Sequence, residues 1–179
     1  ARAWARARGR AELVARELSD QEKRSLLHGG HVGDWAVPLP GYYTGTTDPV
    51  PRLGVPALKM QDAESGFRTM NQRDAGSTTQ WPCMLAMAST WDEGLVGRVA
   101  GAIGEEFRAK GANALLGPAV NVVRPMLGGR NFESLSGEDP QLGSRLTRAY
   151  VTGLQAQGVM SVVKHFAFNE QETHRWHGN

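Results

Sequence analysis

The chain has 179 residues, of which 40% are hydrophobic and 21% are charged, and its formal net charge is +2. This composition is that of a globular protein and excludes a disordered chain, while the length falls short of the ~250 residues of a complete (β/α)8 barrel. The basic excess lies in Arg2, Arg6, Arg8 and Arg10, so no nucleic-acid-binding face is predicted, and the sequence contains no apolar run of ~18 residues that would predict a membrane span.

The amino-terminal part of the chain is predicted to be helical. Ser19 and Glu22 have the spacing of a capping box, and the helix that follows ends at a pair of glycines. We therefore divide the chain into an N-terminal helical segment, residues 1–30, and a second domain, residues 31–179. The second domain opens with residues 31–56, which are rich in Gly, Pro, Tyr and Thr and are predicted to form a long ordered loop.

Beyond this loop, three short apolar segments alternate with two amphipathic ones. The apolar segments are predicted strands and comprise residues 57–61, 114–116 and 159–163. The first amphipathic segment has Thr90 and Glu93 at capping-box spacing and ends at Gly111. The second begins at Asp139, which is followed by proline, and ends at Gly158. The order strand, helix, strand, helix, strand predicts an α/β fold with a parallel sheet.

Polar residues follow the carboxyl end of each predicted strand. Asp62 follows the first strand, residues 117–138 form a loop after the second, and Lys164 and His165 follow the third. Because the carboxyl ends of parallel strands meet at one edge of a sheet, these segments should converge into one site. The charged residues there suit a sugar, since carboxylates accept hydrogen bonds from hydroxyl groups and cations donate to hydroxyl oxygens. They are Asp62, Arg68, Arg130, Glu133, Glu138, Asp139, Lys164, His165, Glu170 and Glu172.

Several segments resemble motifs of glycoside hydrolase family 3. Residues 164–166 follow a valine-rich strand and resemble the Lys-His signature of that family, and residues 62–68 (DAESGFR) resemble its Asp-Gly-Pro-x-Gly-x-Arg segment. Residues 129–133 and 138–140 are similar to its Gly-Arg-x-x-Glu and Glu-Asp-Pro segments, and residues 51–58 resemble the segment that leads into its early strand. The residues after the Lys-His pair lack the Pro-Gly-His stretch of the N-acetylglucosaminidase branch, which favours the β-glucosidase branch.

The resemblance implies that residues 31–179 are the N-terminal part of a (β/α)8 TIM barrel, incomplete within this chain. It implies hydrolysis of terminal non-reducing β-D-glucosyl residues in β-glucosides or oligosaccharides, by a retaining mechanism and in a secreted or extracellular protein. It also implies that the sugar at the non-reducing end is bound by Asp62, Arg68, Arg130, Lys164 and His165. The nucleophile, an Asp, and the acid/base, a Glu, are expected beyond residue 179, so this chain is expected to hold the sugar without cleaving it.

The residues also leave alternatives open. Ala63 replaces a glycine of the motif and is compatible with the same turn only if its φ is negative. Arg130 and Glu133 are able to form a structural ion pair that orders their loop. Lys164 at the end of a strand would also suit a Schiff-base lyase. A third possibility is a degenerate homologue that binds sugar without catalysis.

No metal or other cofactor is predicted. His28 and His31 are three residues apart, as are His174 and His177, but a pair of ligands is incomplete for zinc. No glutamate-flanked helical arrangement of the kind found in zinc proteases accompanies them.

Overall fold

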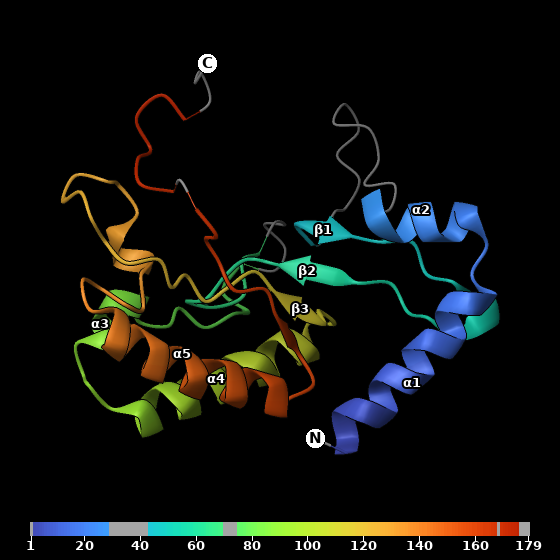
Figure 1. The fold of residues 1–179 in the computed structure, drawn as a ribbon. Helices are drawn as coiled ribbons and strands as arrows, with labels where there is room; N and C mark the ends of the chain where they lie inside the picture. The colour runs from blue at the N-terminus through green and yellow to red at the C-terminus, as the bar shows by residue number, and fades with distance from the viewer. Residues whose placement is uncertain (1, 29–42, 70–74, 168, 176–179) are drawn as a thin grey trace. The chain divides into compact units, whose positions relative to one another are not determined.

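The computed structural model describes residues 2–28, 43–69, 75–167 and 169–175 (Figure 1). The chain divides into two compact units, Ala1–Lys59 and Met60–Asn179. The domain boundary predicted after residue 30 falls in a part of the chain outside the described residues and stays a prediction. Across the described ranges, no helix combines the length and the apolar character needed to cross a membrane.

The first unit is mostly helical. It contains helices α1 (Arg2–Glu17) and α2 (Asp20–His28), strand β1 (Gly45–Thr46) and the short 3₁₀ helix η1 (Pro51–Leu53). The predicted capping box is confirmed, because Ser19 N donates to Glu22 Oε2 at 2.8 Å and Glu22 N donates to Ser19 Oγ at 3.3 Å. Arg52 in η1 also donates to Glu22, at 2.8 Å from Nε to Oε1, and this contact lowers the pKa of Glu22 to about 2.

The second unit is built on a parallel sheet of strands β2 (Lys59–Gln61), β3 (Ala114–Leu115) and β4 (Met160–Ser161). Strand β3 is central, with Leu115 opposite Gln61 on one side and opposite Ser161 on the other. The strands are shorter than predicted, but single hydrogen bonds of 2.9 Å continue the ladder from Leu116 N to Gln61 O and from Val162 N to Leu115 O. The predicted parallel α/β order is confirmed, and these strands do not close into a barrel.

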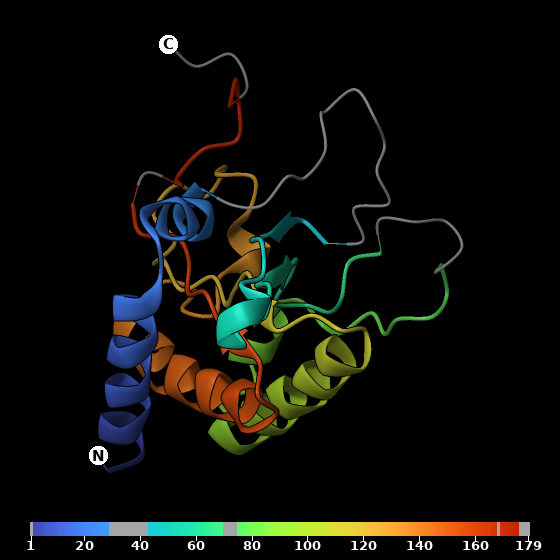
Figure 2. The same cartoon turned by 90° about the vertical axis from the view of Figure 1, so that its right-hand side faces the viewer.

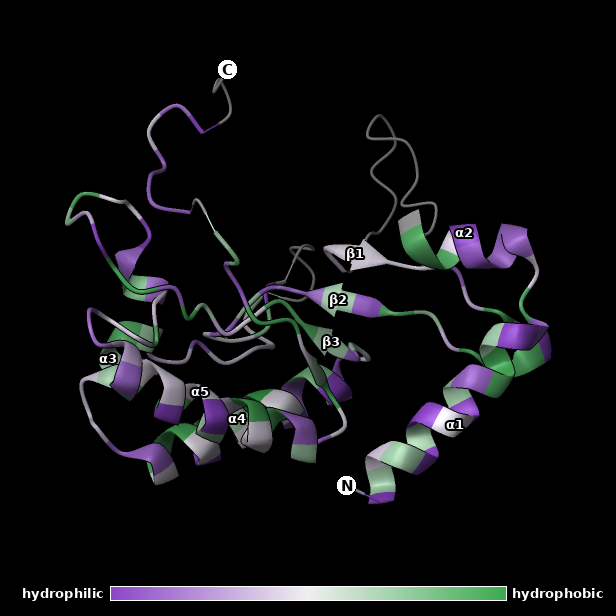
Figure 3. Cartoon of the chain, viewed as in Figure 1, coloured by the Kyte–Doolittle hydropathy of each residue, from purple (hydrophilic) through white to green (hydrophobic). Residues whose placement is uncertain are grey.

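The helices of the second unit are α3 (Met84–Ala88), α4 (Glu93–Ala109) and α5 (Pro140–Ala156). Helices α4 and α5 pack against each other on one side of the sheet (Figures 1 and 2). Glycines permit their close approach, because a Cβ on Gly153 would lie 2.2 Å from the carbonyl oxygen of Gly97. Polar and apolar residues alternate around both helices, as Figure 3 shows, which is the pattern of helices with one buried face.

Side-chain caps fix where α4 and α5 begin. The predicted cap Asp139 is confirmed, since its Oδ1 accepts hydrogen bonds from the first turn of α5 at 2.8 and 3.1 Å. The predicted cap Thr90 is wrong by two residues. Asp92 Oδ1 accepts the capping bond of α4 at 2.9 Å, whereas the Thr90 hydroxyl donates to a carbonyl group of α3. Gly111 and Gly158 follow the two helices with φ values of 80° and 78°, as expected for helix-terminating glycines.

The core between the sheet and these helices is mostly apolar, and two of its buried polar side chains lie near the end of β2. Its largest fully buried apolar or aromatic side chains include Phe107, Ile103, Leu115, Leu146, Tyr150 and Leu154. Gln61 and Glu64 are buried among the core residues, with 0% and 1% exposure. Gln61 is satisfied by the turn that follows it: its Nε2 donates to Arg68 O at 2.7 Å and its Oε1 accepts from Asp62 N at 3.1 Å. The side chain at the strand end thus shapes the first loop of the site.

Candidate functional site

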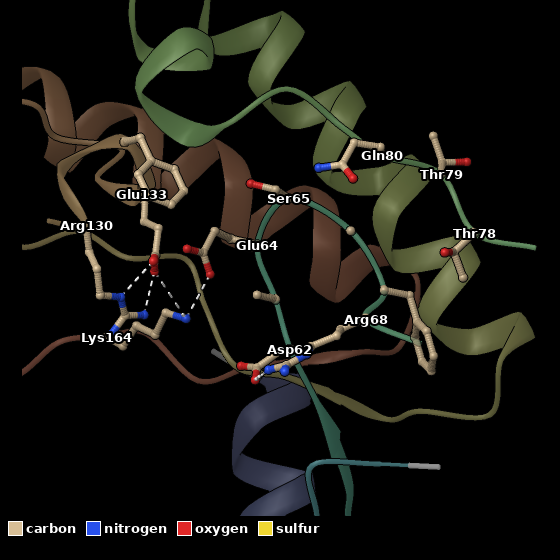
Figure 4. A pocket seen from close by; sticks show the side chains of 14 residues that line it. Asp62, Glu64, Ser65, Arg68, Thr78, Thr79, Gln80, Arg130, Glu133 and Lys164 are labelled. Carbon is tan, nitrogen blue, oxygen red and sulfur yellow. Dashed lines mark hydrogen bonds and ion pairs between the residues drawn. The ribbon is translucent and has the colours of Figure 1, made fainter. Parts of the chain in front are cut away.

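A pocket of about 420 Å³ opens at the carboxyl ends of the parallel strands (Figure 4). Segments that are distant in the sequence form it: the turn after β2, the residues before α3, the loop around the short 3₁₀ helix η3 (Asn131–Glu133), and the chain after β4. The polar and charged side chains that line it are Asp62, Glu64, Ser65, Arg68, Thr78, Thr79, Gln80, Arg130, Glu133 and Lys164. The predicted convergence of three strand ends is therefore observed.

The turn after β2 places Asp62 and Arg68 together. Arg68 N donates to Asp62 O at 2.8 Å, and the Arg68 Nη1 lies 3.6 Å from Asp62 Oδ2. Ala63 and Gly66 close the turn with two backbone hydrogen bonds, of 2.8 and 3.2 Å. The φ of Ala63 is not positive, so alanine is compatible with the turn in which the family motif has glycine. Gly66, with φ of 129°, cannot be replaced without strain, because a Cβ there would lie 2.5 Å from Thr79 O.

Two acids and two cations form a cluster on another wall of the pocket. Lys164 Nζ lies 3.0 Å from Glu64 Oε2 and 4.0 Å from Glu133 Oε2. The closer contact is an ion pair, although its angles depart from those of a directed hydrogen bond. Arg130 holds Glu133 with two hydrogen bonds, from Nε to Oε1 at 2.7 Å and from Nη2 to Oε2 at 2.6 Å. The structural ion pair considered for Arg130 and Glu133 is thus present, and both residues also line the pocket.

Burial and charge act differently on the two acids of this cluster. Burial raises the pKa of Glu64, and the neighbouring Lys164 ammonium offsets that rise only in part. Burial also acts to raise the pKa of Glu133, but the hydrogen bonds and positive charge of Arg130 outweigh it and hold that pKa below its usual range. The same contact raises the pKa of the Arg130 guanidinium. Each carboxylate that lines the pocket is paired with a cation, which suits binding better than nucleophilic attack.

The loop that carries Arg130 and Glu133 is fastened by side chains to the chain after β3. Ser134 Oγ donates to Asn121 O at 2.6 Å, and Ser136 Oγ donates to Val120 O at 2.7 Å. Both serines are buried, so these hydrogen bonds are shielded from competing water. The loop is long and irregular in sequence, yet its backbone has defined partners.

His165 is the one predicted binding residue that does not line the pocket. Its Nδ1 lies 3.1 Å from Asn121 Oδ1 and 3.1 Å from Asn169 Nδ2. Burial lowers the pKa of His165, and the positive charges of Arg130 and Lys164 lower it further. His165 therefore lies next to the cluster, and its Nδ1 either donates to Asn121 Oδ1 or accepts from Asn169 Nδ2, depending on the tautomer of the ring.

The other acids of the predicted site do not line the pocket. Asp139 caps α5, Glu138 and Glu170 are exposed, and Glu172 lies 3.6 Å from Arg130 Nη1.

Some residues of the pocket were not predicted from the sequence. Glu64 is one of them, although an acid two residues after a strand-end aspartate is a signal that could have indicated it. The others are the polar segment before α3 and Phe132, which is half exposed at the pocket.

Within the described residues, no group of three or more His, Cys, Asp and Glu side chains is arranged to hold a metal ion. His31 and His177 lie outside the described ranges, as does the side chain of His28.

The fold and the site together define the class of protein. This is an α/β protein that corresponds to part of a (β/α)8 barrel, because it has a parallel sheet, helices on one side of that sheet and a charged pocket at the carboxyl ends of the strands.

The chain belongs to glycoside hydrolase family 3. Residues 41–175 match the family described as "Glycosyl hydrolase family 3 N terminal domain". The match confirms the resemblance drawn from the sequence motifs and the assignment of the fold to part of the (β/α)8 domain of that family.

Curated relatives and solved structures agree with this assignment. The chain is 38% identical to beta-glucosidase B of Emericella nidulans over 165 residues, which cover 92% of the chain and 18% of that protein. It is similar to beta-glucosidase 3B of Thermotoga neapolitana in complex with alpha-D-glucose, with a TM-score of 0.80 and 39% identity over 90% of this chain and 23% of that one. DesR, a beta-glucosidase of Streptomyces venezuelae in complex with D-glucose, gives a TM-score of 0.77 at 36% identity, covering 93% of this chain and 20% of that one. The chain thus spans about a fifth of the length of these relatives.

Proposed function

We propose that this chain supplies the part of a β-glucosidase that binds the terminal non-reducing glucosyl residue of a β-glucoside. The observation that carries the proposal is the pocket at the strand ends, where Asp62, Arg68, Arg130 and Lys164 come together. Similar structures that were solved in complex with glucose support a glucosyl ligand. The complete gene product would hydrolyse the glycosidic bond by a retaining mechanism, with a nucleophile and an acid/base that are not among these residues.

The proposed roles follow from the chemistry of each side chain. Asp62 accepts hydrogen bonds from sugar hydroxyl groups, while Arg130, Lys164 and Arg68 donate to hydroxyl oxygens. His165 is assigned a further bond through Nε2, because the two asparagine contacts engage Nδ1. The pairing of Lys164 with Glu64 disfavours the Schiff-base alternative, since an ion-paired ammonium is a poor nucleophile.

Calorimetric titration of the complete gene product with glucose tests the binding roles. Asp62→Asn and Lys164→Met should each weaken binding roughly 10- to 100-fold, because each removes a hydrogen bond to a charged group. Glu93→Gln is the matched control: it breaks an exposed ion pair with Arg145 outside the pocket lining and should leave affinity unchanged. Equal affinity of all variants for glucose would contradict the proposed site.

Hydrolysis tests the enzymatic part of the proposal. The complete gene product should cleave aryl β-glucosides with retention of configuration, whereas the 179 residues alone should bind without cleaving. Cleavage by the 179-residue chain that disappears on mutation of one of its own acids would show that the nucleophile lies within it. Glucose binding without any hydrolysis by the complete product would instead identify the sugar-binding, inactive homologue.

A further inference from the structure

Glu64 is a buried acid with no assigned role, and the fold holds it in place from several sides. Its side chain is almost completely buried, with 1% exposure of the residue. Tyr150, in α5, donates a hydrogen bond from its hydroxyl to Glu64 O at 2.8 Å. Gly117, after β3, leaves the space that the carboxylate occupies, because a Cβ there would lie 2.9 Å from Glu64 Oε2. Segments after β2 and β3 and helix α5 thus all define where this carboxylate lies.

The carboxylate of Glu64 points at Lys164 (Figure 4). Its Oε2 is 3.0 Å from Lys164 Nζ, while the other acid near that ammonium, Glu133, is 4.0 Å away. Glu133 already accepts two hydrogen bonds from Arg130. Glu64 is therefore the closer of the two acids to Lys164. Glu133, in contrast, shares its negative charge with Arg130 through these two hydrogen bonds.

A buried acid of this kind is costly for stability. Removing a carboxylate from water carries a penalty that one ion pair often fails to recover, and apolar replacements of buried ion pairs are frequently neutral or stabilising. Burial raises the pKa of Glu64, and the neighbouring Lys164 ammonium offsets this rise only in part. The contact with Lys164 is thus better explained by the geometry it imposes than by a gain in folding free energy.

We propose that Glu64 is a positioning residue for Lys164, and that the ion pair holds Lys164 Nζ where the ammonium donates to one hydroxyl group of the bound glycone. The inference rests on the proposed function and deepens it. Without the Glu64 charge, Lys164 relaxes toward Glu133, its remaining acidic neighbour. The ammonium then no longer matches the hydroxyl oxygen, and affinity falls for sugars that carry that hydroxyl group.

Titration of the complete gene product with glucose and with the set of monodeoxyglucoses tests this role. Glu64→Gln, which keeps the shape and removes the charge, should weaken glucose binding about tenfold. For one monodeoxyglucose, the one that lacks the hydroxyl held by Lys164, the variant and the unaltered protein should bind equally. Lys164→Met should single out the same monodeoxyglucose, and the double variant should bind glucose no more weakly than Lys164→Met alone.

Other results would overturn the inference. An equal loss for glucose and every monodeoxyglucose would mean that Glu64 supports the fold of the pocket in general, and no loss at all would mean that Lys164 needs no such support. Tyr150→Phe keeps every pocket charge and releases the Glu64 backbone, so it should give the same position-selective loss in smaller measure, even if Glu64→Gln does not fold. Absence of glucose binding by the unaltered protein would overturn the proposed function as well, and is therefore distinct from a failure of this inference alone.

Discussion

Arg130 binds both carboxylate oxygens of Glu133, at 2.7 Å through Nε and at 2.6 Å through Nη2. This planar, two-point contact depends on the guanidinium group, which a lysine ammonium cannot reproduce. The contact connects the start and the end of η3 and so gives the pocket a rigid wall from an otherwise irregular loop.

Arg130→Lys should therefore lower both stability and sugar affinity. One of the two hydrogen bonds to Glu133 is lost, so we expect the free energy of unfolding to fall by about 1 kcal/mol and glucose affinity to fall roughly tenfold. Urea denaturation and calorimetric titration measure these effects. Arg145→Lys applies the same exchange to an exposed contact with Glu93 and should change neither quantity appreciably. Indistinguishable effects of the two substitutions would contradict the role given to Arg130.

The contact between α4 and α5 predicts a large difference between two glycine substitutions. Gly153→Ala should destabilise the protein by about 1–3 kcal/mol, because its Cβ would lie 2.2 Å from the Gly97 carbonyl oxygen and the helices would have to separate. Gly101→Ala is the matched control in the same interface, since its Cβ would meet Gly153 O at 3.9 Å. The control should be neutral or stabilising, because alanine favours helix more than glycine does. A melting temperature lowered equally by both would disprove the packing argument.

The first turn of α5 predicts a measurable capping effect. Asp139→Ala removes the oxygen that accepts two backbone hydrogen bonds and should reduce the free energy of unfolding by about 1 kcal/mol. Glu138→Ala changes the adjacent exposed acid and serves as the comparison. Thermal unfolding followed by circular dichroism would reveal the difference, and equal melting temperatures for the two variants would argue against the cap.

The lowered pKa of His165 predicts that the stability contributed by this residue decreases as the pH falls. Burial and then the nearby cations lower its pKa in the folded state below the ordinary value of 6.5. The unfolded chain therefore binds a proton at a higher pH than the folded protein does, so His165 contributes stability that is present above pH ~6.5 and is lost as pH falls through the folded-state pKa. Melting temperatures measured on both sides of that pH should decline less on acidification in His165→Gln than in the unaltered protein. Titration of the His165 ring by NMR provides a direct check, and a folded-state pKa above 6.5 would reverse the expected slope.

The alternation of strands and helices, the family and the strand-end location of most site residues could be predicted from the amino-acid sequence. Asp62 and Lys164 could be placed at one edge because parallel strands necessarily bring their carboxyl ends together. Asp139 could be identified as a cap because capping is a local interaction between residues a few positions apart. The same local rule failed at Thr90 because Asp92, two residues later, provides a better acceptor to the first turn of α4.

Which side chains face each other became evident only from the folded arrangement of the chain. Glu64 belongs to the turn that follows the first predicted strand, yet it lies in the core because Gly117 leaves space for it and Tyr150 holds its backbone. His165 follows Lys164 directly, but its ring lies beside the pocket instead of in its lining, with Nδ1 next to Asn121 from the distant chain after β3 and next to Asn169 four residues further on. Such outcomes depend on packing between segments far apart in the chain, and no pattern of neighbouring residues encodes that packing.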